Sequence, residues 1–303
     1  MRQPPRPLPA PLRRGDTVGV VAVASGPSAQ ALAAGVAYLE RAGFKVLVAS
    51  PKAERGDYTA GSDGARAAAM HGLIDRGARA LIAARGGYGV MRMLPLLDWG
   101  RLARWGGWIV GFSDLTALHG ALPGRFPAAS LHGPLAVTLA RHEQSSKATI
   151  DWLCGRSPET LFTFRPAQVV RGGVARGISV GGNLSLLASL VGTPWEPSYD
   201  GAVLFLEDVN EPGYSLDRLL TQLRLSSRLA RVRAVVVGRL ARCGLGETGW
   251  RQRWRRVLAE AVPASAVVVE GLPFGHGAAN LPFPLGVEVG IDTTLGTVSW
   301  GGR

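Results

Sequence analysis

The sequence predicts an α/β protein, with a parallel sheet covered by helices in its N-terminal part and a β-rich part after it. Two observations support this fold class. Short apolar runs alternate with amphipathic, helix-like segments along the N-terminal half, as in parallel sheets with helices on both faces. From Gly155 onwards the composition changes to β-rich segments punctuated by Gly and Pro. A chain of 303 residues, 47% of them hydrophobic, suits one large or two modest domains with real cores.

The first elements follow from apolar periodicity and from glycine stops. Predicted strands cover residues 17–24, 45–49 and 80–84, and predicted helices cover residues 30–42 and 63–76. Gly43 and Gly77 end the two helices, and Asp63 is expected to be the N-cap of the second one. Residues 1–14 are rich in Pro and Arg and lack the apolar region of a signal peptide, so we expect a loose tail.

The rest of the chain is organised around residues 108–119. An apolar run predicts a buried strand that breaks at Gly111, and a helix resumes at Leu115. Ser113 and Asp114 therefore stand where a strand gives way to a helix, at the carboxyl end of a sheet. A serine at this position can attack a carbonyl, with main-chain N–H groups of the helix start near the oxyanion. The alternative is that Ser113 or Asp114 simply caps the helix.

Later elements are read in the same way. Helices are predicted at residues 145–154, 215–225 and 250–262, and β segments at residues 161–170, 174–180, 202–206, 234–237, 266–269, 287–291 and 297–300. The last two β segments form a closing hairpin. Residues 181–187 open another helix, for which Asn183 is a plausible cap.

A Gly-rich segment, RGGYG at residues 85–89, follows the third predicted strand. Consecutive glycines allow positive φ angles and a close approach of the backbone to a ligand. The segment does not fit a dinucleotide fingerprint, because Arg92 replaces the last glycine and no acidic partner stands at the right distance. Gly86 and Gly87 therefore form either a plain turn or a loop of oxyanion donors.

Three polar residues occupy comparable places beyond predicted strands. Ser113 follows one apolar strand, Glu207 follows a second, and His276 closely follows a third. Nucleophilic catalysis needs a hydroxyl, an imidazole that takes its proton and a carboxylate that orients the imidazole. Taken singly, His276 could be an ordinary surface histidine and Glu207 a solvated strand end. Their joint placement predicts a serine hydrolase, although Leu115 excludes the G-x-S-x-G motif.

Composition limits the other function classes. The net charge is +12, but 31 of the 34 basic residues are arginines spread along the chain, and aromatic residues are not interleaved with them, so we do not expect nucleic-acid binding. The cluster at residues 251–256 is expected to be the solvated face of a helix. Cys154 and Cys243 are expected to be unpaired thiols, no metal-type Cys/His spacing occurs, and no apolar run is long enough to span a membrane.

Five motifs resemble those of one peptidase family. They are GFSDLTALH at residues 111–119, RGGYG at 85–89, GGNLSLL at 181–187, LEDVNE at 206–211 and PFGH at 273–276. The motifs occur in the right order along the chain, and from about Gly15 to the C-terminus the sequence is similar to the LD-carboxypeptidases of peptidase family S66, which also includes the microcin C self-immunity peptidases. Two segments depart from the family pattern, residues 23–25 and 277–280, and leave the exact substrate open.

The resemblance implies a flavodoxin-like nucleophile domain at residues 15–140, a linker at 141–172 and a smaller β-rich domain at 173–303, with the active site between the domains. It implies a Ser113–His276–Glu207 triad, with Glu211 as a neighbouring carboxylate of lower rank. The oxyanion donors would be the N–H groups of Gly87 and Asp114. From charge alone, we expect Arg85, beside Gly86, to receive the substrate carboxylate.

The resemblance also implies a cytoplasmic homodimer without metal or cofactor. Its substrate would be murein tetrapeptide, from which terminal D-alanine is released in cell-wall recycling. The first alternative is an immunity peptidase that cleaves a peptidyl- or aminoacyl-nucleotide conjugate, with Trp195 stacking on the base. Two further alternatives are a non-catalytic muropeptide-binding protein and a nucleic-acid binder, the last suggested only by charge.

Overall fold

The computed structural model describes residues 4–51 and 58–301. The chain divides into two compact units, which we call the N-terminal and C-terminal units. The N-terminal unit consists of Pro7–Ser157 and Ala279–Pro284. The C-terminal unit contains Pro158–Ala278 together with the described parts of residues 1–6 and 285–303.

The N-terminal unit is built on a six-stranded sheet with the order β12-β5-β4-β3-β1-β2. Its strands are β1 (Thr17–Val21), β2 (Lys45–Ala49), β3 (Ala80–Ala83), β4 (Trp108–Gly111), β5 (Ser130–His132) and β12 (Phe283–Leu285). The pairs β1–β2, β1–β3, β3–β4 and β4–β5 are parallel. The order 2-1-3-4-5 is that of flavodoxin-like folds, which bind ligands where the strand order reverses between β1 and β3. The expected flavodoxin-like fold is confirmed.

Short helices connect these strands. They are α1 (Ala29–Arg41), α2 (Asp63–Asp75), α3 (Val90–Met93), α4 (Trp99–Trp105), α5 (Thr116–Ala121), α6 (Ala136–Leu139) and α7 (Glu143–Leu153), with 3-10 turns at Leu94–Leu96 and Ser113–Leu115. The N-cap of α2 is Ser62, whose hydroxyl accepts from Ala65 N–H at 3.2 Å. The prediction of Asp63 as the cap is wrong by one residue, and Asp63 lies in the first turn, where its charge favours the helix dipole.

The N-terminal segment is not a loose tail. Leu12 is 3% exposed, and its N–H donates to Leu153 O at 2.7 Å. The indole of Trp108 donates to Ala10 O at 3.0 Å, and Ala129 N–H donates to Pro7 O at 2.8 Å. Residues 7–12 are thus fixed by main-chain hydrogen bonds that composition does not reveal, and residues 1–3 of the expected tail lie outside the described residues.

The C-terminal unit is built on an eight-stranded sheet with the order β6-β14-β13-β8-β9-β10-β11-β7. Its strands are β6 (Thr160–Thr163), β7 (Val169–Arg171), β8 (Val174–Asn183), β9 (Ala202–Val209), β10 (Ala234–Ala241), β11 (Val267–Val269), β13 (Glu288–Asp292) and β14 (Thr297–Trp300). The central strands β8, β9, β10 and β11 pair in parallel, and the flanking pairs are antiparallel. The predicted closing hairpin is confirmed as β13–β14.

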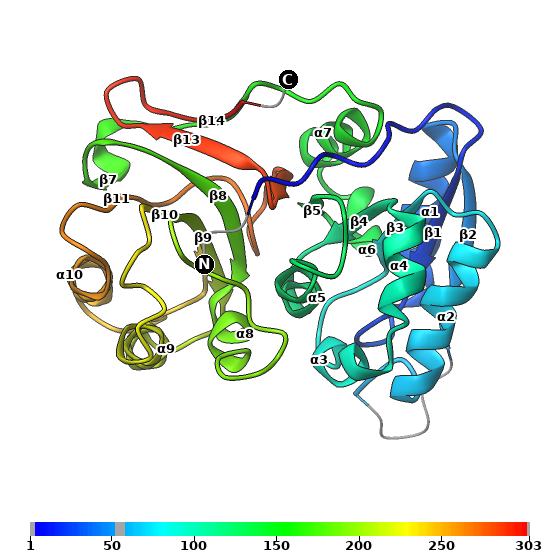
Figure 1. The fold of residues 1–303 in the computed structure, drawn as a ribbon, viewed down its shortest axis with the longest axis horizontal. Coiled ribbons are helices and arrows are strands. Elements are labelled where there is room, and N and C mark those ends of the chain that lie inside the picture. The colour runs from blue at the N-terminus through cyan, green and yellow to red at the C-terminus, as the bar shows by residue number, and fades with distance from the viewer. Residues whose placement is uncertain (1–3, 52–57, 302–303) are drawn as a thin grey trace. The chain divides into compact units, whose positions relative to one another are not determined.

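Three helices cover one face of this sheet (Figure 1): α8 (Leu184–Ser189), α9 (Gly213–Leu225) and α10 (Trp250–Ala261). Their buried side chains share a core with alternate residues of the strands, namely Ala202, Leu204, Leu206, Val235 and Val237. Because side chains alternate along a strand, Phe205 points to the opposite face, where its ring packs on Phe274. Glu207 occupies the same face as Phe205, and Asp208 the helix face. Asn183 caps α8 as expected, accepting from Leu186 N–H at 3.1 Å.

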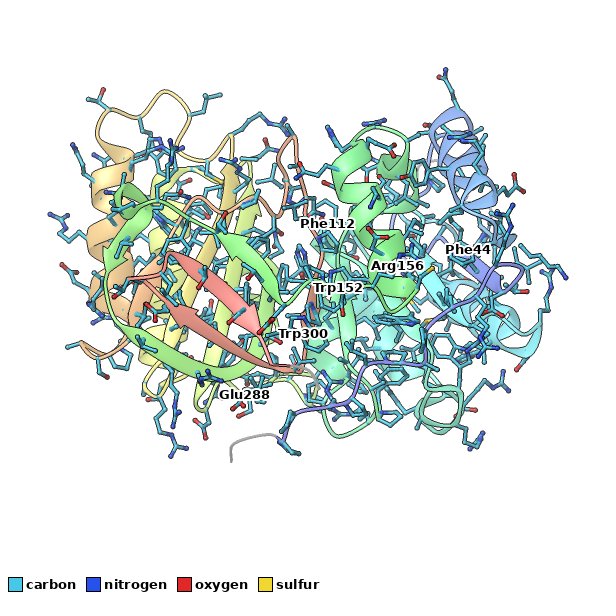
Figure 2. The ribbon with its side chains drawn as sticks, turned by 90° about the horizontal axis from the view of Figure 1, so that it is seen from above. Phe44, Phe112, Trp152, Arg156, Glu288 and Trp300 are labelled. Carbon is cyan, nitrogen blue, oxygen red and sulfur yellow. The ribbon has the colours of Figure 1, made fainter. Side chains whose placement is uncertain are left out.

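Residues 141–172, expected as a linker, carry regular structure. α7 belongs to the N-terminal unit, whereas β6 and β7 pair at the two ends of the eight-stranded sheet and a 3-10 turn (Pro166–Gln168) lies between them. β6 pairs with β14. Trp300 of β14, which is labelled in Figure 2, donates its indole N–H to Pro158 O at 2.7 Å. β6 and β7 are held by partner strands about a hundred or more residues away in the sequence, which local sequence does not show.

Candidate active site

Ser113 lies in a strained turn between β4 and α5. β4 ends at Gly111, a 3-10 turn covers Ser113–Leu115, and α5 begins at Thr116. The φ angle of Ser113 is +63°, which is uncommon for a residue other than glycine. Such conformations cost roughly 1–3 kcal/mol and cluster at functional sites. Sharp strand-to-helix turns also present the nucleophilic serine of many hydrolases.

Neither Ser113 nor Asp114 caps α5. The cap positions of the 3-10 turn and of α5 are Phe112 and Leu115, and neither makes a side-chain cap hydrogen bond. The Asp114 carboxylate instead accepts a 2.8 Å hydrogen bond from the N–H of Val90, the first residue of α3. The alternative role of this pair, simple capping of the following helix, is therefore wrong.

Asp114 is buried, with 2% of its surface exposed. Burial raises the pKa of this carboxyl to about 6, while the Val90 N–H and the positive charge of Arg66 oppose the shift. A carboxylate in this position ties the residue after Ser113 to the end of the Gly-rich loop.

The Gly-rich loop after β3 packs against Ser113. A Cβ atom at Gly86 would lie 2.9 Å from Ser113 Oγ, and a Cβ atom at Gly87 would lie 2.2 Å from Ser25 Oγ. Gly87 also has a φ angle of +114°, so both positions require glycine. Ser25 holds the loop in place: its N–H donates to Gly86 O, and its hydroxyl accepts from Tyr88 N–H, each at 3.3 Å. The loop backbone is thus fixed beside the Ser113 hydroxyl.

Arg85 begins this loop and is exposed. Its Nη1 donates to Gly26 O at 2.8 Å, in the turn that follows β1. The guanidinium therefore lies near the edge of the sheet at which Gly86 and Ser113 are found, and it has further N–H groups for a ligand.

In the C-terminal unit, Glu207 and His276 form a hydrogen-bonded pair. His276 Nδ1 lies 2.6 Å from Glu207 Oε2, and the main-chain N–H of His276 donates to the same oxygen at 3.2 Å. The Glu207 side chain is fully buried, whereas that of His276 is 22% exposed. A carboxylate at Nδ1 favours the tautomer with its proton on Nδ1, which leaves Nε2 to accept a proton.

A β-bulge lies beside Glu207. The register of β9 and β10 shifts between Val237 and Leu240, so that residues 238–239 together oppose Glu207. Glu207 lies inside β9 rather than beyond its end, which corrects the placement expected from sequence. Bulges of this kind interrupt strand pairing and often lie next to active sites.

The interrupted strand edge binds the loop that carries His276. Arg239 N–H donates to Phe274 O at 2.9 Å, and Arg239 forms a parallel bridge with Gly275. Gly275 has a φ angle of +91°, and a Cβ atom there would lie 2.6 Å from Glu207 Cβ. Glycine is therefore required for the backbone to pass over Glu207 and place His276 on it.

Two neighbouring carboxylates have other partners. Glu211 accepts hydrogen bonds from the hydroxyls of Ser185 and Ser215. Asp208 accepts from both the N–H and the hydroxyl of Ser185, at 2.9 and 2.8 Å, and burial raises its pKa. The carboxylate bound to His276 is that of Glu207 and not that of Glu211.

The expected site residues fall into two groups. Ser113, Asp114, Arg85, Gly86 and Gly87 lie in the N-terminal unit, and Glu207, Glu211 and His276 lie in the C-terminal unit. In the N-terminal unit Gly86 packs against Ser113, and in the C-terminal unit Glu207 is hydrogen-bonded to His276. Two residues of the N-terminal unit were not predicted as part of the site, Ser25 and the buried Arg66, because their partners come from distant loops.

Two other histidines have structural partners. The buried His119 contacts Ser130 Oγ at 2.8 Å and Gly111 O at 2.9 Å. His132 is buried and stacks on Phe283, with ring centroids 4.6 Å apart. His119 thus supports the end of β4, from which the Ser113 turn begins.

Neither a metal-binding cluster nor a membrane-spanning helix is found among the described residues. Within residues 4–51 and 58–301, no cluster of three or more His, Cys, Asp or Glu side chains is placed to bind a metal ion. Cys154 and Cys243 are unpaired, as expected, and burial raises the pKa of Cys243 to about 11. No helix in the described part of the chain combines the length and apolar character that crossing a bilayer requires.

Comparison with known families identifies the class. Residues 18–133 match the LD-carboxypeptidase N-terminal domain, and residues 176–291 match the LD-carboxypeptidase C-terminal domain. The fold is therefore that of a peptide hydrolase assembled from two α/β units. The chain belongs to peptidase family S66, the LD-carboxypeptidases.

Relatives cover nearly the whole chain. It is 39% identical over 305 residues to a Streptomyces coelicolor protein named as a candidate carboxypeptidase, which covers 96% of this chain and 95% of that protein. It is 33% identical over 287 residues to the murein tetrapeptide carboxypeptidase of Pseudomonas aeruginosa, with 89% and 91% covered. It is 27% identical over 324 residues to the Microcin C7 self-immunity protein MccF of Escherichia coli, with 94% and 93% covered.

Solved structures show the same fold. The muramoyltetrapeptide carboxypeptidase from Oxalobacter formigenes superimposes with a TM-score of 0.81 at 26% identity, covering 93% of this chain and 97% of that one. MccF in complex with glutamyl sulfamoyl guanosine gives a TM-score of 0.85 at 23% identity, with 98% of both chains covered.

Proposed function

We propose that this carboxypeptidase is a serine enzyme that releases terminal D-alanine from murein tetrapeptide in cell-wall recycling, as a muramoyltetrapeptide carboxypeptidase. The observation that carries the proposal is the 2.6 Å contact between His276 Nδ1 and Glu207 Oε2. It prepares an imidazole for general base catalysis in a family whose members include enzymes named for this substrate. The strained Ser113 supplies the nucleophile.

In the proposed mechanism, His276 Nε2 removes the Ser113 proton as the serine oxygen attacks the amide carbonyl. His276 then protonates the D-alanine amine, and the carbon–nitrogen bond breaks. A water molecule, deprotonated by His276, attacks the resulting ester and regenerates Ser113. Glu207 holds the imidazole in the required tautomer and stabilises its protonated form.

Main-chain N–H groups would bind the oxyanion. We assign this role to Gly87 and Asp114, which lie in the loop against Ser113 and directly after it. Each such donor contributes roughly 3–4 kcal/mol to transition-state stabilisation in comparable enzymes. Gly86 gives the substrate close access to Ser113, and the guanidinium of Arg85 would receive the terminal carboxylate of the peptide.

The location and the oligomeric state are proposed from the resemblance to the S66 family. We propose a cytoplasmic homodimer that uses neither metal nor cofactor. Light scattering of the purified protein is expected to give about twice the 31.9 kDa chain mass. A monomeric mass would contradict the dimer but would leave the proposed mechanism unaffected.

The function is tested by incubating the protein with murein tetrapeptide and measuring free D-alanine by mass spectrometry. The wild-type protein should release D-alanine, and Ser113→Ala should abolish release while leaving the fold intact. Ser189→Ala is the matched control, because Ser189 is an exposed serine on α8. Release by Ser113→Ala at the wild-type rate would contradict the mechanism.

A second substrate class is favoured by the likeness to MccF, of which one solved structure holds glutamyl sulfamoyl guanosine. An aminoacyl-sulfamoyl adenylate tests this alternative. Cleavage of the adenylate without release of D-alanine from the tetrapeptide would assign the protein to conjugate hydrolysis through the same Ser113.

A further inference from the structure

Arg66 is a fully buried arginine on α2, with none of its surface exposed. Its Nη1 donates to Val23 O and, at 2.8 Å, to Gly89 O, and its Nε donates to Gly61 O at 3.3 Å. Its Nη2 pairs with Asp63. Burying a guanidinium is costly unless its donors are satisfied, and here most partners are main-chain carbonyls.

The three carbonyls belong to three separate segments at the carboxyl edge of β1 and β3. Val23 follows β1, Gly61 precedes α2, and Gly89 ends the Gly-rich loop after β3. This edge contains the point where the strand order reverses, at which flavodoxin-like folds bind their ligands. One side chain therefore fixes the relative positions of the loops around this point.

A second tie comes from the Ser113 side of the loop. The Asp114 carboxylate accepts from Val90 N–H, and Val90 is the residue directly after Gly89. Arg66 and Asp114 thus hold adjacent residues of the same segment, and their charges attract each other. The segment they hold begins at Gly86, whose backbone packs on Ser113 Oγ.

We propose that Arg66 is a positioning residue for catalysis, which sets the place of the Gly86–Gly87 backbone relative to Ser113 by holding Gly89 while Asp114 holds Val90. The inference rests on the proposed function of Ser113 and Gly87. The role requires the planar fork of arginine, because a shorter or neutral side chain leaves carbonyl groups unpaired in a buried place.

The test compares wild type, Arg66→Gln and Asp114→Ala at a temperature well below the melting point of each protein. Reactive Ser113 is first titrated with a serine-directed phosphonate, so that kcat is expressed per reactive site. We expect kcat to fall about a hundredfold in Arg66→Gln, with KM changed less than threefold, because small misplacements of oxyanion donors cost this much. The rate of phosphonate labelling should fall in parallel.

Arg79→Gln is the matched control. Arg79 lies directly before β3 in the same unit. Its guanidinium donates to Asp16 at 2.6 Å and to Pro11 O at 3.4 Å, and neither partner belongs to the Gly-rich loop. It should lose stability but keep kcat. If the role of Arg66 is purely structural, Arg66→Gln should show the same pattern: a lower melting temperature, with kcat per reactive site within threefold of wild type. This result would overturn the inference.

The inference can still be tested if Arg66→Gln does not fold or if the wild-type protein cleaves no peptide. If Arg66→Gln does not fold, Asp114→Ala decides, because it removes the acceptor that holds Val90 N–H. The inference then predicts slower turnover and slower labelling in Asp114→Ala, and unchanged kcat and labelling would overturn it. If wild type cleaves none of the peptides, the proposed substrate fails, but the labelling rates of Ser113 still measure the positioning effect.

Discussion

At Ser113 the side chain and the backbone make opposite demands. Nucleophilic attack needs a hydroxyl, whereas a φ angle of +63° suits glycine. We expect Ser113→Gly to exceed Ser113→Ala in free energy of unfolding by about 1 kcal/mol, because both lose the hydroxyl and only glycine relieves the strain. Urea denaturation measures the difference.

The same pair of substitutions at Ser189 provides a control of opposite sign. Ser189 lies in α8, where glycine is less favourable than alanine by about 1 kcal/mol. Ser189→Gly should therefore be the less stable variant. If glycine is no more stable than alanine at position 113, the backbone there is not strained.

Asp114 is expected to make stability depend on pH. Burial raises its pKa from 3.8 to about 6, so the folded protein binds this proton more tightly than the unfolded chain. The stability that Asp114 contributes is fully present below pH 3.8 and is lost as pH rises through 6, a difference of about 3 kcal/mol. Relative to wild type, Asp114→Asn should therefore gain stability as pH rises over this range.

Free energies of unfolding at a series of pH values between 4 and 7.5 test this expectation. Asp98→Asn is the control, because a hydrogen bond from Arg101 N–H lowers the pKa of the exposed Asp98. That variant should differ from wild type by a nearly constant free energy of unfolding between pH 4 and 7.5, because the Asp98 carboxylate is ionised in both the folded and the unfolded state over most of this range. A constant difference between Asp114→Asn and wild type would show that Asp114 titrates alike in both states.

The residues of the proposed triad stand near predicted strand ends and could be selected from sequence, whereas Arg66, which is held by distant carbonyls, could not. Ser113, Glu207 and His276 each stand near the end of an apolar run, which sequence periodicity reveals. Arg66 lies in an ordinary helical segment, and nothing local indicates that its side chain is buried against Val23. Burial of a charged residue is a tertiary property.

At the scale of elements, the Glu207–His276 pair is built by a bulge and a glycine. The bulge at residues 238–239 frees a strand edge, and Gly275 allows the backbone to pass over Glu207. Neither feature follows from hydrophobic pattern, because a bulge inserts one residue without changing composition. The sequence therefore predicted the participants of this pair but placed Glu207 beyond β9 and not within it.

The N-terminal segment is expected to stabilise the fold. Leu12→Ala should lower the free energy of unfolding by about 2–5 kcal/mol, because it leaves a cavity at a buried leucine. Leu295→Ala is the matched control, since Leu295 is 73% exposed, and it should change stability by about 0.5 kcal/mol or less. Equal effects of the two substitutions would mean that residues 7–12 are loosely held.

At the scale of the whole molecule, the alternation of apolar runs and helices was enough to predict a parallel sheet covered by helices, whereas its flavodoxin-like order was implied by the resemblance to the S66 family. The parallel centre of the second sheet was less evident, because its flanking strands pair antiparallel and its composition is rich in Gly and Pro. β6 pairs with β14, and β7 with β11, across long sequence separations. Strand pairing of this kind is set by tertiary packing rather than by local pattern.

The proposed triad requires residues of two units to act as one. His276→Ala should slow the labelling of Ser113 by a serine-directed phosphonate at least a hundredfold, because the hydroxyl loses its proton acceptor. Glu207→Gln should slow labelling through the tautomer of His276, and the double variant should be no slower than His276→Ala, since groups that act as a unit are not additive. Glu211→Gln is the matched control: Glu211 binds Ser185 and Ser215 and should leave labelling within threefold of wild type. Wild-type labelling in His276→Ala would show that Ser113 reacts without His276, and additive losses in the double variant would show that Glu207 and His276 do not act as a unit.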